Sequence, residues 1–330
     1  MGSFEARKHE LMQQNPERTI SNQQIDEYWN SVLRKQAHVP LLVLRETQNS
    51  PYSTVRVDKL TFQGFDETLV HCWLLLPRRE LDVNPLPCVI VYQGYMGDRG
   101  LPDRYAAWLL RGFSVLAVDA RGQAGQTGSC LSLSEGWVKG WVTQGIRHID
   151  GSYYKAIALD AVRAVDAAAA QPEIDMSRLA AVGGSQGGGL ALLAAALHPQ
   201  LGVCVADIPN MCHLEYGLMH STGSLSEIAA YLKRYPDRLP AVRQTLVHVD
   251  LLNLVHRISI PVMISVGWKD TICPPETIYA VYNRLDAPKQ LIDYPFSGHE
   301  VSEYQHSLGM DFVTANFRNQ AKTPSASSGR

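Results

Sequence analysis

Several features that would assign a sequence to a specialised class are missing from this chain. Its 30 lysines and arginines nearly balance 32 aspartates and glutamates, and the formal charge of −2 gives no electrostatic basis for binding nucleic acid or an anionic membrane. No uninterrupted apolar run is long enough to span a bilayer, and residues 1–20 lack the apolar core of a secretory signal. We therefore expect a cytoplasmic protein with no nucleic-acid partner and no membrane partner.

Paired cysteines are also missing. The six cysteines are scattered along the chain, form no CxxC pair, and mostly lie in apolar runs that are typical of strands. Reduced cysteines pack there as small apolar side chains. The pattern predicts reduced core residues rather than a disulfide framework, at Cys72, Cys88, Cys130, Cys204, Cys212 and Cys273.

What is present is enough apolar sequence for a large core. Apolar residues make up 45% of the 330 residues and charged residues 19%, which is typical of a globular protein. The length allows one large α/β domain or two small ones, and the pattern along the chain favours one. We expect a single domain over residues 1–320, with residues 1–50 as an N-terminal extension and residues 321–330 as a disordered tail.

The order of the expected elements points to a largely parallel sheet. A helix is expected over Ser21–Leu33, capped by Ser21 or Asn22, and a hairpin is expected from Val55–Gln63 and Leu69–Leu76. Short apolar runs then alternate with helical segments, and such alternation predicts a parallel sheet with helices on both faces. The runs are Cys88–Tyr92, Ser114–Val118, Leu179–Val182, Val203–Ala206, Val262–Val266 and Gln290–Tyr294.

Two intervals interrupt this alternation. Residues 121–151 form a long loop with several glycines, and a loop of that length in a compact domain is usually functional or covers a site. Residues 210–257 form a polar segment with a helical pattern, inserted between the sixth and seventh expected core strands, and we interpret it as a lid or an assembly surface. In and beside the long loop, Trp137, Trp141 and Tyr153 either stack on a sugar or pack the loop, because aromatic rings bury a large area in both cases.

One serine lies among glycines at the junction between a strand and a helix. Residues 183–187 read Gly-Gly-Ser-Gln-Gly, which is the G-x-S-x-G pattern of a serine held on a sharp turn. A short apolar run precedes the pattern, and an Ala/Leu-rich helix over 187–197 follows it. This context predicts that Ser185 is a nucleophile, with Gly183 and Gly187 allowing the close backbone approach that the turn requires.

A serine hydroxyl needs a base to accept its proton and an acid to orient that base. In hydrolases with a parallel sheet of this kind, the acid and then the histidine follow the serine along the chain, on loops at the carboxyl ends of later strands. Asp270 and His299 occupy such positions after the expected strands at 262–266 and 290–294. The competing candidates fit less well: Asp207 comes too soon after the serine, Asp293 lies within its strand, and His306 falls in the final helix.

Attack on a carbonyl also requires donors for the oxyanion that forms. The backbone amide of Gln186, directly after the serine, is one expected donor because it starts the helix. The other is expected in the loop after the strand at 88–92, and we assign it to the amide of Tyr95.

Together these motifs resemble a known family. Arg121-Gly122-Gln123, the serine motif at 183–187 and His299-Glu300 resemble the motif set of carbohydrate esterase family seven, the acetyl xylan esterases and cephalosporin C deacetylases. The resemblance extends through Gly267–Pro275 to the final helix. It implies the α/β-hydrolase fold, Ser185, Asp270 and His299 as the catalytic triad, and the amides of Tyr95 and Gln186 as the oxyanion hole. Arg121 and Gln123 belong to the signature, and we expect them to play a supporting role.

The resemblance also implies the substrates and the assembly. It implies a serine esterase that removes acetyl groups from small acetylated substrates, without metal or organic cofactor, and that forms a ring-like hexamer. Gln93 replaces a histidine of many members, and Trp268-Lys269 replaces a more apolar pair, so the pocket is expected to differ in shape. A general short-chain carboxylesterase, a peptidase, and a catalytically silent binding protein with the same fold stay open as alternatives.

Overall fold

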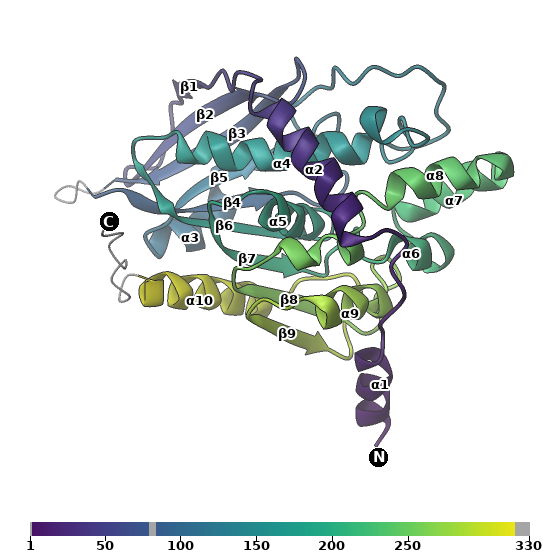
Figure 1. Cartoon of the computed structure of the whole chain (residues 1–330). Helices are drawn as coiled ribbons and strands as arrows, with labels where there is room; N and C mark the ends of the chain where they lie inside the picture. Colours follow the sequence, from purple (N-terminus) through teal and green to yellow (C-terminus); the bar gives the residue numbers. More distant parts are fainter. Residues whose placement is uncertain (1, 79–83, 321–330) are drawn as a thin grey trace, which may run out of the picture.

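The structure is a computed structural model that describes residues 2–78 and 84–320 (Figure 1). In these residues one sheet of nine strands runs through the molecule in the spatial order β1-β2-β3-β5-β4-β6-β7-β8-β9. The strands are β1 (Leu44–Thr47), β2 (Val55–Gln63), β3 (Leu69–Pro77), β4 (Leu86–Tyr92), β5 (Ser114–Val118), β6 (Ile174–Gly184), β7 (Leu201–Asp207), β8 (Val262–Gly267) and β9 (Lys289–Tyr294).

The sheet is antiparallel at one edge and parallel elsewhere. β1, β2, β3 and β5 pair antiparallel in that order, and β2 and β3 form the predicted hairpin. From β5 through β4 and β6 to β9 every pair is parallel. The carboxyl ends of the parallel strands therefore lie at one side of the sheet, where loops from distant parts of the sequence can meet.

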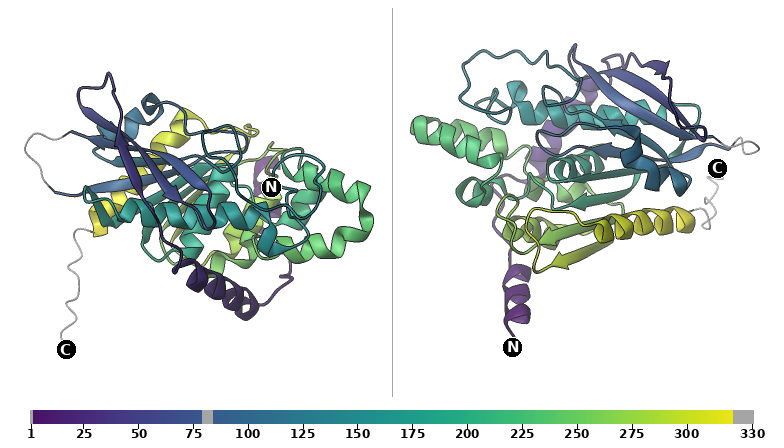
Figure 2. Two further views of the ribbon diagram at one scale, coloured as in Figure 1. Left: turned by 90° about the horizontal axis from the view of Figure 1, so that it is seen from above. Right: turned by 180° about the vertical axis from the view of Figure 1, so that it is seen from behind.

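Helices cover both faces of the sheet, as the alternation predicts (Figures 1 and 2). The α-helices are α1 (Ser3–Met12), α2 (Asn22–Gln36), α3 (Ala106–Leu110), α4 (Tyr153–Ala169), α5 (Gln186–Leu197), α6 (Leu214–His220), α7 (Leu225–Arg234), α8 (Leu239–Leu246), α9 (Pro275–Arg284) and α10 (Glu303–Gln320). Short 3-10 helices are η1 (Pro102–Tyr105), η2 (Ile149–Gly151), η3 (Pro236–Arg238), η4 (Leu251–Asn253) and η5 (Val255–Arg257).

Alternate residues of the central strands face the two helical layers. In β4, Cys88 and Ile90 belong to the larger core with α4 and α5, whereas Val89 packs in a second core that includes Val313 and Phe317 of α10. Because side chains alternate across a strand, a strand buried on both faces reads as a continuous apolar run. This is why these strands are visible in the sequence.

The predicted helix over Ser21–Leu33 is present as α2, which begins one residue later, at Asn22, and ends three residues later, at Gln36. Of the two predicted caps, Ser21 is the cap: its Oγ accepts a hydrogen bond from the Gln24 amide, and the Gln24 side chain accepts one from the Ser21 amide. This reciprocal arrangement satisfies two amide groups that would otherwise lack partners at the start of the helix. The strand β1 was not predicted.

The segment over 210–257 is helical, with α6, α7, α8 and three 3-10 helices. It lies between β7 and β8, which are the sixth and seventh of the predicted strands because β1 was not among them. Residues 119–148 contain no helix or strand, as predicted for the long loop. The predicted disordered tail lies outside the described residues, and the single-domain assignment stays a prediction.

The six cysteines, all within the described residues, are free. Five are buried as predicted, but the prediction is wrong for Cys130, which is exposed because it lies in the long loop rather than in a strand. In the described part of the chain, no helix combines the length and apolar character needed to cross a membrane.

Candidate active site

Ser185 lies on a strained turn between β6 and α5. Its backbone has φ 57° and ψ −120°, and a positive φ is unfavourable for a residue with a Cβ. The turn is held on two sides, since the Ser185 amide donates to the Asp207 carbonyl at 2.9 Å and the Ser185 carbonyl accepts from the Asn210 amide at 2.9 Å. The strand therefore ends in a rigid turn that projects the serine side chain.

Two glycines of the motif are needed for space. A Cβ on Gly183 would overlap the backbone of Gly187, and a Cβ on Gly187 would overlap the Tyr92 carbonyl. The end of β4 thus passes directly against the first turn of α5. This close approach brings the loop after β4 beside Ser185.

The three residues predicted as a triad meet at the carboxyl ends of the strands. His299 Nε2 lies 2.9 Å from Ser185 Oγ, and His299 Nδ1 lies 2.7 Å from Asp270 Oδ2. The Asp270 side chain is fully buried, whereas 21% of the His299 side chain is exposed. The imidazole is therefore placed to exchange a proton with Ser185 while the carboxylate fixes its orientation.

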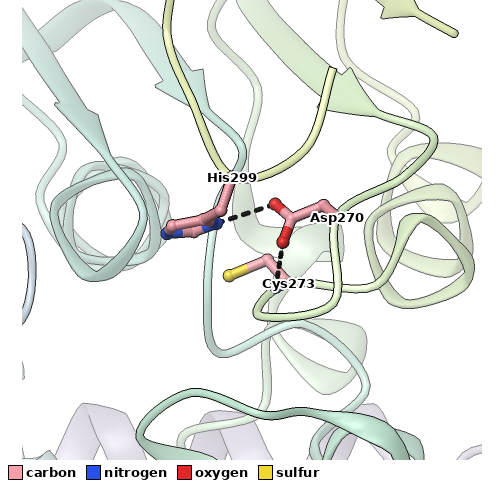
Figure 3. Close-up of side chains that lie close together, drawn as sticks. All are labelled: Asp270, Cys273 and His299. Carbon is pink, nitrogen blue, oxygen red and sulfur yellow. Dashed lines mark hydrogen bonds and ion pairs between the residues drawn. The ribbon is translucent and has the colours of Figure 1, made fainter. Parts of the chain in front are cut away.

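Backbone amides hold Asp270 in place. Its Oδ1 accepts hydrogen bonds from the amides of Ile272 at 2.7 Å and Cys273 at 2.9 Å, which leaves Oδ2 directed at the imidazole (Figure 3). These bonds come from the turn just after β8. The two backbone donors fix the carboxylate, so that its other oxygen can orient the imidazole and stabilise it when it is protonated.

The same corner contains a group with metal-binding potential. Ligand atoms of Asp270, Cys273 and His299 lie within 4.8 Å of one another. Both carboxylate oxygens and both imidazole nitrogens already have hydrogen-bond partners, however, and burial raises the pKa of the Cys273 thiol. Because a metal ligand must be the thiolate, these residues fit proton transfer better than a metal site. The expectation that no metal or cofactor takes part stays a prediction.

Gln123 connects the two predicted oxyanion donors. Its Nε2 donates to the Gln186 side chain at 2.9 Å, and its Oε1 accepts from the Met96 amide at 2.7 Å. Gln186 is the first residue of α5, where its amide has no acceptor within the helix. Gln123 therefore ties the start of α5 to the loop that carries Tyr95.

The Tyr95 side chain is held by two other segments. Its hydroxyl donates to Glu227 of α7 at 2.8 Å and accepts from the Trp141 amide at 3.0 Å. The Trp141 ring packs edge-on against the Tyr95 ring with centroids 5.4 Å apart. No local sequence pattern predicts the involvement of Glu227, and only knowledge of the tertiary contact reveals it.

Arg121 lies away from the triad and is completely buried. It forms ion pairs with Asp160 of α4 at 2.5 Å and with Asp66 of the β2–β3 turn at 2.9 Å, and these carboxylates raise the pKa of the Arg121 guanidinium. Its carbonyl accepts a hydrogen bond from Tyr153. Arg121 thus joins its own loop after β5 to the β2–β3 turn and to α4, which accords with a supporting role.

The competing residues do not reach the histidine. Asp207 Oδ1 accepts hydrogen bonds from Ser265 and Gln305, and Asp293 accepts from Trp268 and Tyr279. His306 lies in α10, as expected.

A hollow of about 450 Å³ opens at the triad, and its lining includes Ser185, His299, Gln93, Arg104 and Glu300. Gln93 is buried there and donates to the Tyr105 hydroxyl at 3.3 Å. A larger hollow of about 580 Å³ lies among the amino ends of the strands, where it is lined by none of the triad residues.

The order of serine, aspartate and histidine along a largely parallel sheet is that of the α/β-hydrolase class, to which this fold belongs. Within this class, residues 1–315 match the acetyl xylan esterase (AXE1) family, and the chain belongs to that family. The resemblance inferred from the motifs is thereby confirmed.

The structures of similar proteins have been solved. An acetyl xylan esterase from Paenibacillus sp. R4 is 33% identical, with a TM-score of 0.89 over 93% of this chain and 98% of that one. Acetyl xylan esterase 1 from Thermoanaerobacterium sp. JW/SL YS485 is 27% identical, with a TM-score of 0.87 over 94% and 98% of the two chains.

A curated relative is longer. The acetyl esterase Axe7A of Xylanibacter ruminicola is 28% identical over 85% of this chain, which spans 64% of the length of that relative. The family and these three relatives are all named for the hydrolysis of acetyl esters, and none of the three is named as a peptidase or a binding protein.

Proposed function

We propose that this chain is a serine esterase that removes acetyl groups from hydroxyls of small acetylated substrates. The observation that carries the proposal is the position of His299 between Ser185 and Asp270, at 2.9 and 2.7 Å. Acetylated xylo-oligosaccharides are the first substrate class to test, because the relatives are named for acetyl xylan esterase activity. Cephalosporin-type acetyl esters are the second, by the resemblance of the motifs.

In the proposed mechanism, His299 Nε2 accepts the proton of Ser185 as its Oγ attacks the acetyl carbonyl. The tetrahedral intermediate collapses to an acetyl-enzyme as its bond to the sugar oxygen breaks, and the protonated histidine gives its proton to that oxygen, which leaves as a hydroxyl. Water then attacks the acetyl group with His299 again as the base, which releases acetate and restores the serine. Asp270 stabilises the imidazolium in both steps.

The amides of Tyr95 and Gln186 are the proposed donors to the oxyanion. This assignment is supported by the contact between the end of β4 and the first turn of α5, and by the hydrogen bonds of Gln123 to the Gln186 side chain and the Met96 amide. A single oxyanion donor is worth about two to three orders of magnitude in rate. Arg121, Gly183 and Gly187 act indirectly in this proposal, because they fix the loops that present the reacting groups.

The decisive experiment compares the wild type with Ser185→Ala in the hydrolysis of an aryl acetate. The variant should lose activity by at least about 10⁴-fold while keeping its thermal stability, because the serine forms the covalent bond. A mass increase of one acetyl group on the wild type, trapped at low pH, would identify the intermediate. An unchanged rate in the variant would reject Ser185 as the nucleophile.

The acyl preference and the alcohol are tested with panels of esters. Acetyl esters should be hydrolysed faster than octanoyl esters, and the reverse order would favour a lipase-like pocket. Acetylated sugars and acetylated antibiotics, compared at equal concentration, separate the two substrate classes.

We also propose a homo-oligomer, a hexamer by resemblance, in a cytoplasmic setting. Phe4 of α1 and Phe296 near the triad are exposed by 53% and 73%, and their rings contact each other with centroids 5.6 Å apart. Exposed apolar clusters of this kind are candidate association surfaces. Light scattering would measure the assembly, and cell fractionation the location.

A further inference from the structure

A third hollow, of about 520 Å³, lies between the long loop and the helical insertion, outside the proposed catalytic group. Figures 1 and 2 show this loop beside α7 and α8 at the end of the molecule. We call this hollow the arginine cleft. Its lining includes four charged and two aromatic side chains: Glu135, Trp137, Arg147, Arg234, Tyr235 and Arg238.

The cleft carries a positive charge on a chain whose net charge is −2. Arg147 is paired with Glu135 at 2.5 Å, which leaves Arg234 and Arg238 without a carboxylate partner among the described residues. Arginine presents planar N–H donors that match a carboxylate. The cleft is therefore suited to an anion rather than to a cation.

Arg238 is fixed before any ligand arrives. Its guanidinium carbon lies 3.9 Å from the centroid of the Tyr235 ring, and its Nη1 donates to the Tyr231 hydroxyl at 2.7 Å. Stacking and this bond hold the guanidinium plane, while most of its five N–H donors stay available. A fixed donor loses less conformational entropy on binding than a free side chain does.

Two further side chains lack a partner that a ligand would supply. The buried Nε of Arg147 has no hydrogen-bond partner in the described part of the chain, which is costly for a buried donor. Trp137 is 49% exposed, although large aromatic rings usually bury most of their area. Its exposed ring offers a surface on which a sugar can stack.

The cleft is connected to the proposed active site through α7. Glu227 bonds the Tyr95 hydroxyl, and Arg234 lies at the other end of the same helix, roughly 10 Å further along its axis by helical rise. The loop likewise runs from Trp141, which contacts Tyr95, back to Trp137. The cleft therefore lies at the far end of the two segments, α7 and the long loop, that hold the Tyr95 side chain.

We infer that the arginine cleft is a subsite for a carboxylate-bearing sugar of the acetylated substrate, with Trp137 stacking on the sugar and Arg234 and Arg238 binding its carboxylate. This inference rests on the proposed function, because it extends the same substrate. The ligand class is a uronic acid unit on an oligosaccharide.

The test compares two acetylated xylo-oligosaccharides, one with and one without a uronic acid substituent, and an aryl acetate as the basal substrate. In the double variant Arg234→Gln/Arg238→Gln, kcat/KM for the acidic substrate should fall by about tenfold through KM, the size of one charge-assisted hydrogen bond at a partly exposed site. Hydrolysis of the neutral substrate and of the aryl acetate should not change. Trp137→Ala should weaken the binding of both oligosaccharides and leave the hydrolysis of the aryl acetate unchanged.

Arg243→Gln is the matched control, since this exposed arginine belongs to α8 of the same insertion and pairs with Glu215 outside the cleft. It should leave all three rates unchanged. Equal losses on acidic and neutral substrates in the double variant, or no loss on either, would overturn the inference.

A binding measurement separates the subsite from the catalytic proposal. Calorimetry with a deacetylated, uronic-acid-bearing xylo-oligosaccharide should show binding to the wild-type chain that weakens with salt and in the double variant. This result does not depend on turnover, so it supports the cleft even if Ser185 is not the nucleophile. Absence of binding to the wild type would reject the subsite while leaving the esterase proposal intact.

Discussion

The Tyr95 hydroxyl donates a 2.8 Å hydrogen bond to the carboxylate of Glu227, 132 positions further along the chain. The Glu227 carboxylate also lies against Gly140, where a Cβ would overlap it, and Gly140 has a φ of 65° that favours glycine. Three segments, namely the loop after β4, the long loop and α7, therefore meet at one hydroxyl and one carboxylate. Each segment can affect the proposed oxyanion donor through this contact.

The first prediction concerns this contact. Glu227→Ala should lower kcat for an aryl acetate by about three- to tenfold, as expected for a loss of roughly 1 kcal/mol in positioning the Tyr95 amide. Glu227→Gln keeps an acceptor oxygen and should retain most of the rate. Tyr95→Phe should reproduce the Ala variant, and combining the two changes should add little. Wild-type kcat in Glu227→Ala would contradict the role, whereas a lower melting temperature alone would indicate a purely structural one.

The second prediction concerns the carboxylate behind the histidine. Asp270→Asn should lower kcat by about 10⁴-fold, because an amide nitrogen in place of Oδ2 favours the wrong histidine tautomer. The matched control is Asp207→Asn, a buried aspartate that bonds Ser265 and Gln305 instead of the histidine. The control variant should change stability with little effect on kcat. A comparable loss of kcat in both variants would argue against the assignment of Asp270.

The third prediction concerns the contact between β4 and α5. Gly187→Ala should destabilise the fold by about 1–3 kcal/mol or more, because the added Cβ overlaps the Tyr92 carbonyl. Gly128→Ala is the control, since a Cβ there would meet nothing within 4 Å. The stability of that variant should be unchanged or higher by about 0.4–1 kcal/mol, because alanine lowers the conformational entropy of the unfolded chain. Chemical denaturation measures the stability of both variants. Equal stabilities would show that β4 and α5 can move apart at Gly187 without a loss of stability.

The fourth prediction concerns Asp250, which holds the helical insertion. Its carboxylate is buried and accepts hydrogen bonds from the amides of Leu214 at 2.7 Å and Leu252 at 2.9 Å. Burial raises the pKa of Asp250 from 3.8 to about 7, although the amides lower it. Between these values the folded protein binds the proton more tightly than the unfolded chain does. This group's contribution to stability is therefore complete below about pH 4 and is lost as the pH rises through about 7.

One such group changes the free energy of unfolding by at most about 1.4 kcal/mol per pH unit. Asp250→Asn carries no titrating group, so the stability difference between wild type and variant should shrink as the pH is raised from 5 to 8. Urea denaturation at four pH values measures this difference. A difference that does not vary with pH would show that Asp250 titrates normally.

Elements and positions with a local sequence pattern were predictable from the sequence. The central strands are buried on both faces and appear as apolar runs, and Ser185, Asp270 and His299 each follow such a run directly. Because the carboxyl ends of parallel strands share one edge, the order of the runs places the three residues together. The capping box of α2 is likewise complete within four residues.

Features whose position depends on contacts between distant residues were not predictable from the sequence. β1 was missed because its residues Leu44–Thr47 are mostly exposed and too few to show a period. Cys130 resembles the other cysteines in sequence but belongs to a loop. The contact of Glu227 with Tyr95 follows from the packing of α7 against two loops, and no spacing within α7 indicates it.

The burial of five cysteines and the exposure of one make Cys130 the site where a thiol reagent would modify the folded chain. Five of the six cysteines are enclosed by the core, and burial raises the pKa of Cys88 to about 12, so these thiols stay protonated and unreactive. Cys130 is exposed in the same loop that carries Trp137 and Trp141. A maleimide dye would therefore attach once per chain, giving a fluorescent reporter of loop position without any engineered residue.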